Sequence, residues 1–182
     1  FTTRPDTIFG VSFMTLAPEH DLVDKLTTIE QRIDVGKYIE DTAKRTERER
    51  LSEVKRITGV FTGAYAQHPF TGEEIPIWIG DYVLAGYGTG AVMSVPCGDQ
   101  RDYDFATHFD IHIPNIFDGI DISKEAHVEK EHVTIGNSSF LNGLSVSEAS
   151  EKAIAALEAK HAGTGKINYR LRDAVFSRQR YW

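Results

Sequence analysis

The alternation of apolar and polar positions predicts short strands separated by a few helices. Stretches rich in Ile, Val, Phe, Thr and Tyr are typical of strands. The expected strands are 8–16, 60–66, 75–79, 82–84, 91–95, 111–117 and 166–172. Pro76 should place its strand at a sheet edge, or lie near the start of the strand, because proline cannot donate to the ladder. Gly72 is the expected positive-φ residue of the turn before that strand.

Helical spacing of apolar residues, with Pro or a capping side chain at the start, predicts the helices. They are expected at 18–26, 29–53, 100–109 and 147–161. Asp99 should cap the third and Ser147 the fourth, while Gly36 weakens the second. The segment 118–140 has little pattern.

Many short strands with interspersed helices, in no regular alternation, predict an α+β fold. We expect a curled or barrel-like sheet with peripheral helices, and the order disfavours a doubly wound sheet. A length of 182 residues fits one domain, with 41% hydrophobic and 26% charged residues, as is ordinary for a globular protein.

The single cysteine, Cys97, excludes an intramolecular disulfide and suits a reducing cytoplasm. We expect it to be a small loop residue without a chemical role. No apolar run is long enough to span a membrane, and the first residues lack a signal-peptide pattern. Both ends of the chain read as cut, so we expect a piece of a larger protein.

The charge distribution is uneven. A net charge of −7 argues weakly against nucleic-acid binding. However, residues 44–56 hold six bases against three acids, and 166–180 hold five against one. Two solvated faces are the favoured interpretation, and a local basic face remains the alternative.

Several catalytic and metal-binding motifs are absent from the sequence. There is no Cys-x-x-Cys and no His-Glu-x-x-His, so no metal site is expected. The glycines at 86, 88 and 90 match neither a dinucleotide fingerprint nor a phosphate loop, and no Gly-x-Ser-x-Gly elbow occurs.

Two segments carry dense polar chemistry. Thr2-Thr3-Arg4-Pro5-Asp6-Thr7 offers hydroxyls, a guanidinium and a carboxylate around a proline, which suits either a polar ligand or a capped turn. In 90–104, a strand leads into a turn and a helix with acids in its first turn. Asp99 and Asp102 have the spacing of a capping box, and the alternative is that one carboxylate faces a cleft and binds a cation.

These segments, in this order, resemble the editing domain of leucyl-tRNA synthetases. The resemblance rests on Thr2–Thr7, on Gly-Thr-Gly-Ala-Val-Met-Ser-Val-Pro at 88–96 and on Asp-Gln-Arg-Asp-Tyr at 99–103. The stretch 61–78 and the closing Ser-Arg-Gln-Arg-Tyr-Trp at 177–182 resemble the family too. Residues 1–175 are therefore expected to form the editing domain, and 176–182 to begin the return to the catalytic domain.

The resemblance implies hydrolysis of the ester between a noncognate amino acid, such as isoleucine, norvaline or methionine, and the terminal adenosine of leucine tRNA. It implies leucine tRNA, the ester and the rest of the synthetase as partners, with no membrane. No cofactor is expected in this domain, since ATP and magnesium would serve the parent enzyme's catalytic domain. The alternatives are an isoleucyl- or valyl-type editing domain and a tRNA-positioning module without hydrolysis.

The resemblance also implies residue roles. Thr2 and Thr3 would place hydroxyls near the ester, and Asp102 would bind the α-ammonium group; these three form the implied catalytic set. Thr7 would block leucine by steric clash. The implied substrate-binding residues are Thr7, Arg4, Asp6, Tyr87, Met93, Val95, Asp99 and Arg101.

One position departs from the family pattern. Many members have Gly-His before the Asp-Gln-Arg-Asp run, where this chain has Cys97-Gly98. Any acid–base step that depends on that histidine is in doubt here.

Overall fold

The computed structural model describes residues 1–46, 49–50, 56–86 and 88–167. The strands are β1 (Phe13–Leu16), β2 (Gly59–Gln67), β3 (Glu74–Gly80) and β4 (Ala91–Ser94). The helices are η1 (Pro5–Gly10), α1 (Val23–Leu26), α2 (Arg32–Ala43), α4 (Gln100–His108), η2 (Ser139–Leu141) and α5 (Val146–Ala159), of which η1 and η2 are 3₁₀ helices.

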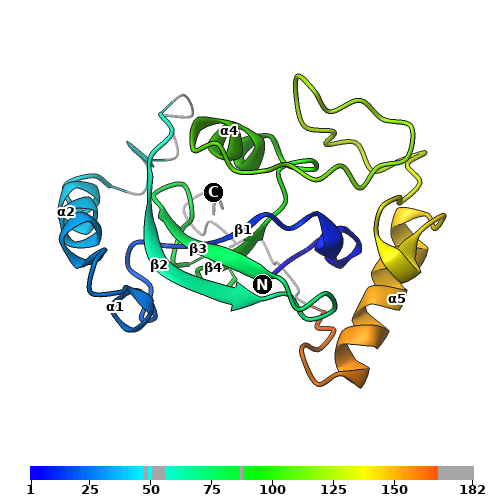
Figure 1. Cartoon of the computed structure of the whole chain (residues 1–182), viewed down its shortest axis with the longest axis horizontal. Helices are drawn as coiled ribbons and strands as arrows, with labels where there is room; N and C mark the ends of the chain where they lie inside the picture. The colour runs from blue at the N-terminus through cyan, green and yellow to red at the C-terminus, as the bar shows by residue number, and fades with distance from the viewer. Residues whose placement is uncertain (47–48, 51–55, 87, 168–182) are drawn as a thin grey trace, which may run out of the picture.

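The strands form one mixed sheet in the order β2-β3-β1-β4, with helices around it (Figure 1). β1 pairs parallel with β3, and the other two pairings are antiparallel. The expected α+β class is confirmed. Within the described part of the chain the sheet is open rather than closed, with β2 and β4 at its edges.

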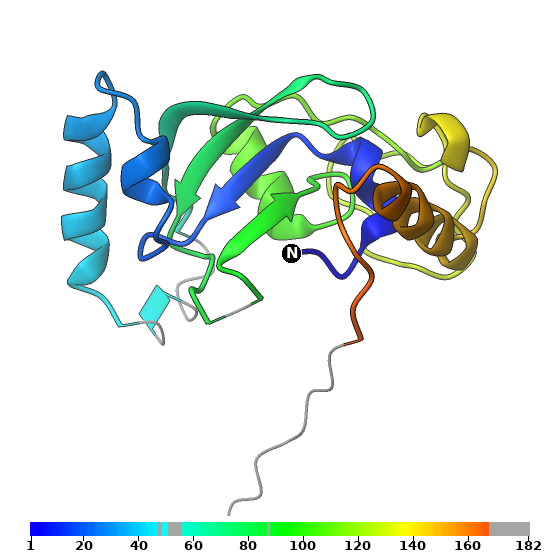
Figure 2. The same ribbon diagram turned by 90° about the horizontal axis from the view of Figure 1, so that it is seen from below.

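The two faces of the sheet pack against different helices. Neighbouring residues of a strand point to opposite faces, so Ile77 and Trp78 meet different partners. One face packs against α1 and α2 through Leu16, Val23, Val35, Ile77 and Ile79. The other packs against α4, where the Phe13 and Phe105 rings stack at a centroid distance of 4.9 Å. α2 and α5 lie at opposite ends of the molecule in both ribbon views (Figure 2).

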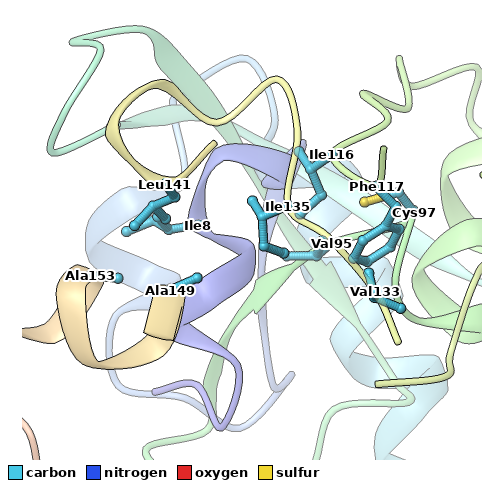
Figure 3. Packing of buried hydrophobic residues seen from close by; sticks show 10 residues of the cluster. All are labelled: Ile8, Val95, Cys97, Ile116, Phe117, Val133, Ile135, Leu141, Ala149 and Ala153. Atoms are coloured by element: carbon cyan, nitrogen blue, oxygen red, sulfur yellow. The ribbon is translucent and has the colours of Figure 1, made fainter. Parts of the chain in front are cut away.

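A third cluster joins η1, the turn after β4, the segment 116–135 and α5 (Figure 3). Its buried members are Ile8, Val95, Cys97, Ile116, Phe117, Val133, Ile135, Leu141, Ala149 and Ala153. Ile8 directly follows the threonine-rich stretch, and Val95 precedes the turn into α4. The packing of both residues in this cluster therefore fixes the positions of the two polar segments. Cys97 lies in the turn before α4, as expected for a loop residue, but its side chain is fully buried.

Local bonds overturn part of the expected first strand. Only residues 13–16 are strand, and Pro5–Gly10 form η1. Pro5 presets a helical φ, and both the Thr7 amide and the Thr7 hydroxyl donate to the Arg4 carbonyl, which closes a turn.

The expected helices form, with different limits. The first shortens to α1, since the His20 ring accepts from the Leu22 amide and holds a turn ahead of it. Within the second, α2 covers Arg32–Ala43 although Gly36 lies inside it, while 47–48 and 51–53 lie outside the described residues. α4 begins after Asp99 as expected. The predicted Ser147 cap is wrong: Ser145 caps α5 in a capping box with Glu148.

Two expected strands differ from the structure. Residues 82–84 form a turn after β3, and 111–117 contribute only a bridge between Phe117 and Ile135. Most of 166–172 lies outside the described residues. β3 is an interior strand, so the predicted edge position is wrong, but Pro76 does lie near the strand start, ahead of the β1 pairing that begins at Ile77.

Candidate functional site

A cavity of about 480 Å³ brings the two polar segments together. Its lining residues come from the N-terminal stretch, the loop after β3, β4 and the start of α4. They are Phe1, Thr2, Thr3, Arg4, Thr7, Tyr82, Val83, Leu84, Val92, Met93, Val95, Gly98, Asp99, Arg101 and Asp102. Nine of the eleven predicted site residues therefore share one cavity.

The threonine-rich stretch forms a pre-organised wall of this cavity. Thr2 Oγ1 accepts from the Arg4 amide at 3.0 Å, and Thr7 Oγ1 donates to the Arg4 carbonyl at 2.8 Å. Thr7 is 2% exposed, so its side chain has little room for another rotamer. The capped turn that the sequence predicted is therefore present, and the same segment lines the cavity.

The first turn of α4 separates the roles of its two acids. Asp99 Oδ1 accepts from the amides of Arg101 and Asp102, at 2.9 and 3.2 Å, and so caps the helix. Asp102 does not complete a capping box. Its Oδ2 instead accepts from the Val95 amide at 2.9 Å, and its Oδ1 from the Tyr82 hydroxyl at 2.9 Å.

Burial makes the Asp102 carboxylate unusual. Removal from water, helped by the nearby Asp99 charge, raises the pKa of Asp102 to about 7. Hydrogen bonds from Val95 and Tyr82 lower the pKa but do not offset the burial. A buried carboxylate at the edge of a cavity is well suited to a cationic ligand group, which would restore the favourable charge interaction lost with water.

Two predicted site residues stand apart from this arrangement. Asp6 does not line the cavity: its carboxylate is fully buried and accepts from Arg4 Nη2 at 2.7 Å and Nε at 3.0 and 3.1 Å. Tyr87 lies outside the described residues.

Sequence reasoning missed several cavity residues. Val83, Leu84 and Val92 add apolar wall, and Tyr82 contacts Asp102. Behind Tyr82 lie two fully buried hydroxyls, Thr15 and Ser94. Their signal in the sequence was a lone hydroxyl within each of two otherwise apolar strands.

The turn that departs from the family pattern lies beside the cavity. Gly98 lines it, whereas the Cys97 thiol points into the hydrophobic core. Burial raises the pKa of the Cys97 thiol to about 11, so it stays protonated and is a poor nucleophile.

Two arginines of the basic stretch 44–56 form ion pairs with little exposure of the arginine side chains. Arg45 Nη1 lies 2.6 Å from Asp81 Oδ2, and Arg50 Nη2 lies 2.8 Å from Glu19 Oε1, with Arg50 only 2% exposed. These two arginines are therefore not part of a solvated face. Most of the second basic stretch, 166–180, lies outside the described residues.

Among the residues that the structure describes, no group of three or more His, Cys, Asp or Glu side chains could hold a metal ion. None of the described helices is long and apolar enough to cross a membrane.

The geometry defines the class of site. A carboxylate, a row of hydroxyls and an apolar wall of Met93, Val95 and Leu84 surround one cavity. Such a site suits a small amphiphilic ligand with an ammonium group, a polar linkage and an apolar side chain.

Comparison with known proteins shows the family. The family model described as leucyl-tRNA synthetase, editing domain, matches residues 1–158. The leucine–tRNA ligase of Christiangramia forsetii is 68% identical over the whole chain, which covers 19% of that protein. The enzyme of Bacteroides thetaiotaomicron is 53% identical, again over the whole chain and 20% of its own length.

A solved structure agrees with the sequence comparisons. It is the ternary complex of a leucyl-tRNA synthetase from Agrobacterium radiobacter K84 with tRNA and LeuAMS. It matches with a TM-score of 0.72 and 33% identity, over 94% of this chain and 18% of that one. The chain belongs to the editing domain family of leucyl-tRNA synthetases, and it spans about a fifth of the length of its relatives.

Proposed function

We propose that this domain hydrolyses the ester of mischarged leucine tRNA. The observation that carries the proposal is the cavity that holds Asp102 opposite the threonine-rich stretch, within a chain of this family. The substrates would be tRNA esters of isoleucine, norvaline or methionine. The family match favours this reading over an isoleucyl- or valyl-type domain.

The need for such a site follows from the limits of hydrophobic selection. One methylene changes binding by only about 1–3 kcal/mol, so a synthetic site cannot strongly reject near-isosteric or smaller amino acids. A second site that admits the wrong side chains and excludes leucine supplies the missing discrimination.

In this proposal different cavity residues contact different parts of the substrate. Asp102 binds the α-ammonium group, and Met93 and Val95 contact the amino-acid side chain. Thr7 narrows the cavity against leucine, since its hydroxyl bond to the Arg4 carbonyl keeps the side chain fixed. The family resemblance also implies a substrate contact for Tyr87.

The remaining polar groups would serve the ester and the nucleotide. Thr2 and Thr3 place hydroxyls near the ester and the terminal adenosine. Arg4 and Arg101 lie at the cavity and would contact backbone phosphate or hold the acids, as Arg4 does with Asp6. Asp99 holds the start of α4, and thereby Asp102, in position.

We propose direct attack by a positioned water on the ester carbonyl carbon. The bond between the carbonyl carbon and the ribose oxygen breaks. A proton passes from the water to the leaving ribose oxygen, and the amino acid and deacylated tRNA are released. The cavity's hydroxyls, main-chain N–H groups and a ribose hydroxyl of the tRNA would stabilise the developing oxyanion. The buried, protonated Cys97 is unsuited to a covalent route.

The domain would act within a longer cytoplasmic ligase, with leucine tRNA and the rest of that ligase as partners. The domain itself would need no cofactor, and ATP and magnesium would act in the parent's catalytic domain. If tRNA phosphates are bound, affinity should fall as salt concentration rises, and a flat response would count against phosphate contacts.

The test is deacylation of leucine tRNA charged with isoleucine, norvaline or leucine, by this chain and by the full-length ligase that we propose to contain it. We expect loss of the first two esters and survival of the third. Asp102→Asn should lower kcat/KM about 100-fold, the cost typical of removing a buried charge partner. Asp104→Asn, on the same helix but not lining the cavity, is the matched control. Binding of tRNA without hydrolysis of any ester would favour a positioning module.

A further inference from the structure

Four polar side chains from four parts of the fold form a continuous hydrogen-bonded chain that ends at Asp102. Ser94 Oγ of β4 lies 2.9 Å from Thr15 Oγ1 of β1. Thr15 Oγ1 lies 3.1 Å from the Tyr82 hydroxyl, in the turn after β3. That hydroxyl donates to Asp102 Oδ1 of α4 at 2.9 Å.

The ionised carboxylate sets the direction of every bond in this chain. A carboxylate only accepts, so Tyr82 must donate its single hydroxyl proton to Asp102. Thr15 then donates to Tyr82 and can accept from Ser94, whose hydroxyl also interacts with Asp102 and lowers its pKa. All donors therefore point toward Asp102, and aligned hydroxyls in a low-dielectric interior polarise one another.

The fold holds Tyr82 firmly in this place. A Cβ at Gly80 would lie 2.8 Å from the Tyr82 ring and 2.9 Å from the Thr15 methyl group, so the absence of a side chain there permits their close approach. The Tyr82 ring also packs against Phe105, at a centroid distance of 5.6 Å. Burial raises the pKa of Tyr82 well above its usual value, so the hydroxyl remains a donor.

We propose that Tyr82 is a positioning residue, backed by Thr15 and Ser94, that holds the Asp102 carboxylate ionised and aimed at the substrate's ammonium group. The inference rests on the proposed function. It assigns to Tyr82 the second of the two bonds that fix the carboxylate, the other being the Val95 amide. A carboxylate anchored through both oxygens cannot rotate away from the cavity.

Other titratable or charged groups lie around Asp102. Asp99 lies at the start of its own helix, and Cys97 lies in the turn after β4. Arg4 and Arg101 line the same cavity. Removal of the Tyr82 hydroxyl leaves all of these in place, so its effect on the titration of Asp102 can be separated from theirs.

The experiment compares Tyr82→Phe with the wild type in the full-length ligase, by the pH dependence of kcat/KM for deacylation of isoleucine-charged tRNA. Loss of the hydrogen bond to the ionised Asp102 carboxylate should raise the midpoint of the acid limb of the pH profile by about one pH unit. In this 182-residue chain, ¹³C NMR of the Asp102 carboxyl should show its titration move in the same direction. Thr15→Val should cause a smaller shift of the same sign, and it stands in if Tyr82→Phe does not fold.

The matched control is Tyr103→Phe, which removes a phenol hydroxyl from the neighbouring residue of α4, where it donates to the Ile122 carbonyl instead. Both the acid limb and the Asp102 titration should match the wild type. If the wild type is active but Tyr82→Phe shifts neither the acid limb nor the titration of Asp102, only the role of Tyr82 is overturned. A wild-type ligase that deacylates none of the esters overturns the proposed function itself, whatever the Asp102 titration shows.

Discussion

The main-chain N–H of Val95 donates to Asp102 Oδ2 at 2.9 Å, so one residue both forms the apolar wall and anchors the carboxylate. β4 ends at Ser94, which leaves the Val95 amide outside the sheet ladder and available to a side chain. The distance between the apolar and ionic parts of the cavity is therefore set by covalent geometry and one hydrogen bond. The proposed discrimination between amino-acid side chains would depend on such a fixed separation.

Thr7→Ala should remove the exclusion of leucine. The side chain is buried at the cavity wall, and its loss should let leucine-charged tRNA be hydrolysed at least about tenfold faster, the scale of one methyl group in an apolar site. Deacylation of leucine- and isoleucine-charged tRNA measures the change. Thr27→Ala is the control, since Thr27, directly after α1, is also buried and donates to the main-chain carbonyl of Val23. If Thr7→Ala still leaves leucine-charged tRNA intact, Thr7 does not exclude leucine.

Asp102 should make folding stability depend on pH. Its pKa is raised from 3.8 to about 7, so the folded state favours the protonated form. The associated stability is present below pH 4 and is lost as the pH rises through 7, a change of about 4 kcal/mol at about 1.4 kcal/mol per unit. Urea unfolding of the wild type and of Asp102→Asn from pH 4 to 8 measures this change as the difference between their free energies of unfolding. Parallel curves for the two proteins would show that Asp102 titrates normally.

Gly98→His tests whether the departure from the family pattern matters. A Cβ at Gly98 would meet Phe117 at 3.4 Å and Val95 at 4.0 Å, which are ordinary contacts, so a side chain should be tolerated. We expect deacylation to change less than about tenfold, since the groups proposed to bind the ester are already present, whereas general acid–base catalysis contributes about 10²–10⁴. Gly98→Ala controls for the added Cβ. A hundredfold gain would show that this chain lacks a step used by its relatives.

Asp6→Asn should damage stability rather than selectivity. Asp6 is fully buried, holds Arg4 through three hydrogen bonds and accepts from Ser150 Oγ of α5 at 3.4 Å. Breaking a buried pair on one side costs about 3 kcal/mol of unfolding free energy. Denaturant unfolding measures this, and the ratio of isoleucine to leucine deacylation should stay unchanged. Asp41→Asn, which breaks an exposed ion pair with Lys44, should alter stability little. A changed ratio would show that Asp6 takes part in substrate binding.

Features set by neighbouring residues could be predicted from the sequence. The Asp99 cap, the turn with positive φ at Gly72 and the amphipathic α5 depend on bonds within a few residues, and all three are present. The two polar segments were also recognisable as candidate sites, because their residue types are dense and ordered as in one family, and most of these residues do line one cavity. Where local bonds competed, as at Ser145 and Ser147 for the α5 cap, composition did not decide between them.

The tertiary structure alone decided which acid serves the cavity. Asp6 and Asp102 both lie in polar segments, yet Asp6 is sealed against Arg4 and α5, while Asp102 reaches the cavity with Tyr82 and Val95 as partners. The partners of Asp102 are brought together by strand pairing and by the packing of α4 on the sheet, contacts that no local pattern records. The sequence by itself determined the chemistry available to this protein, and long-range packing determined which groups lose water and so acquire altered charge and fixed direction.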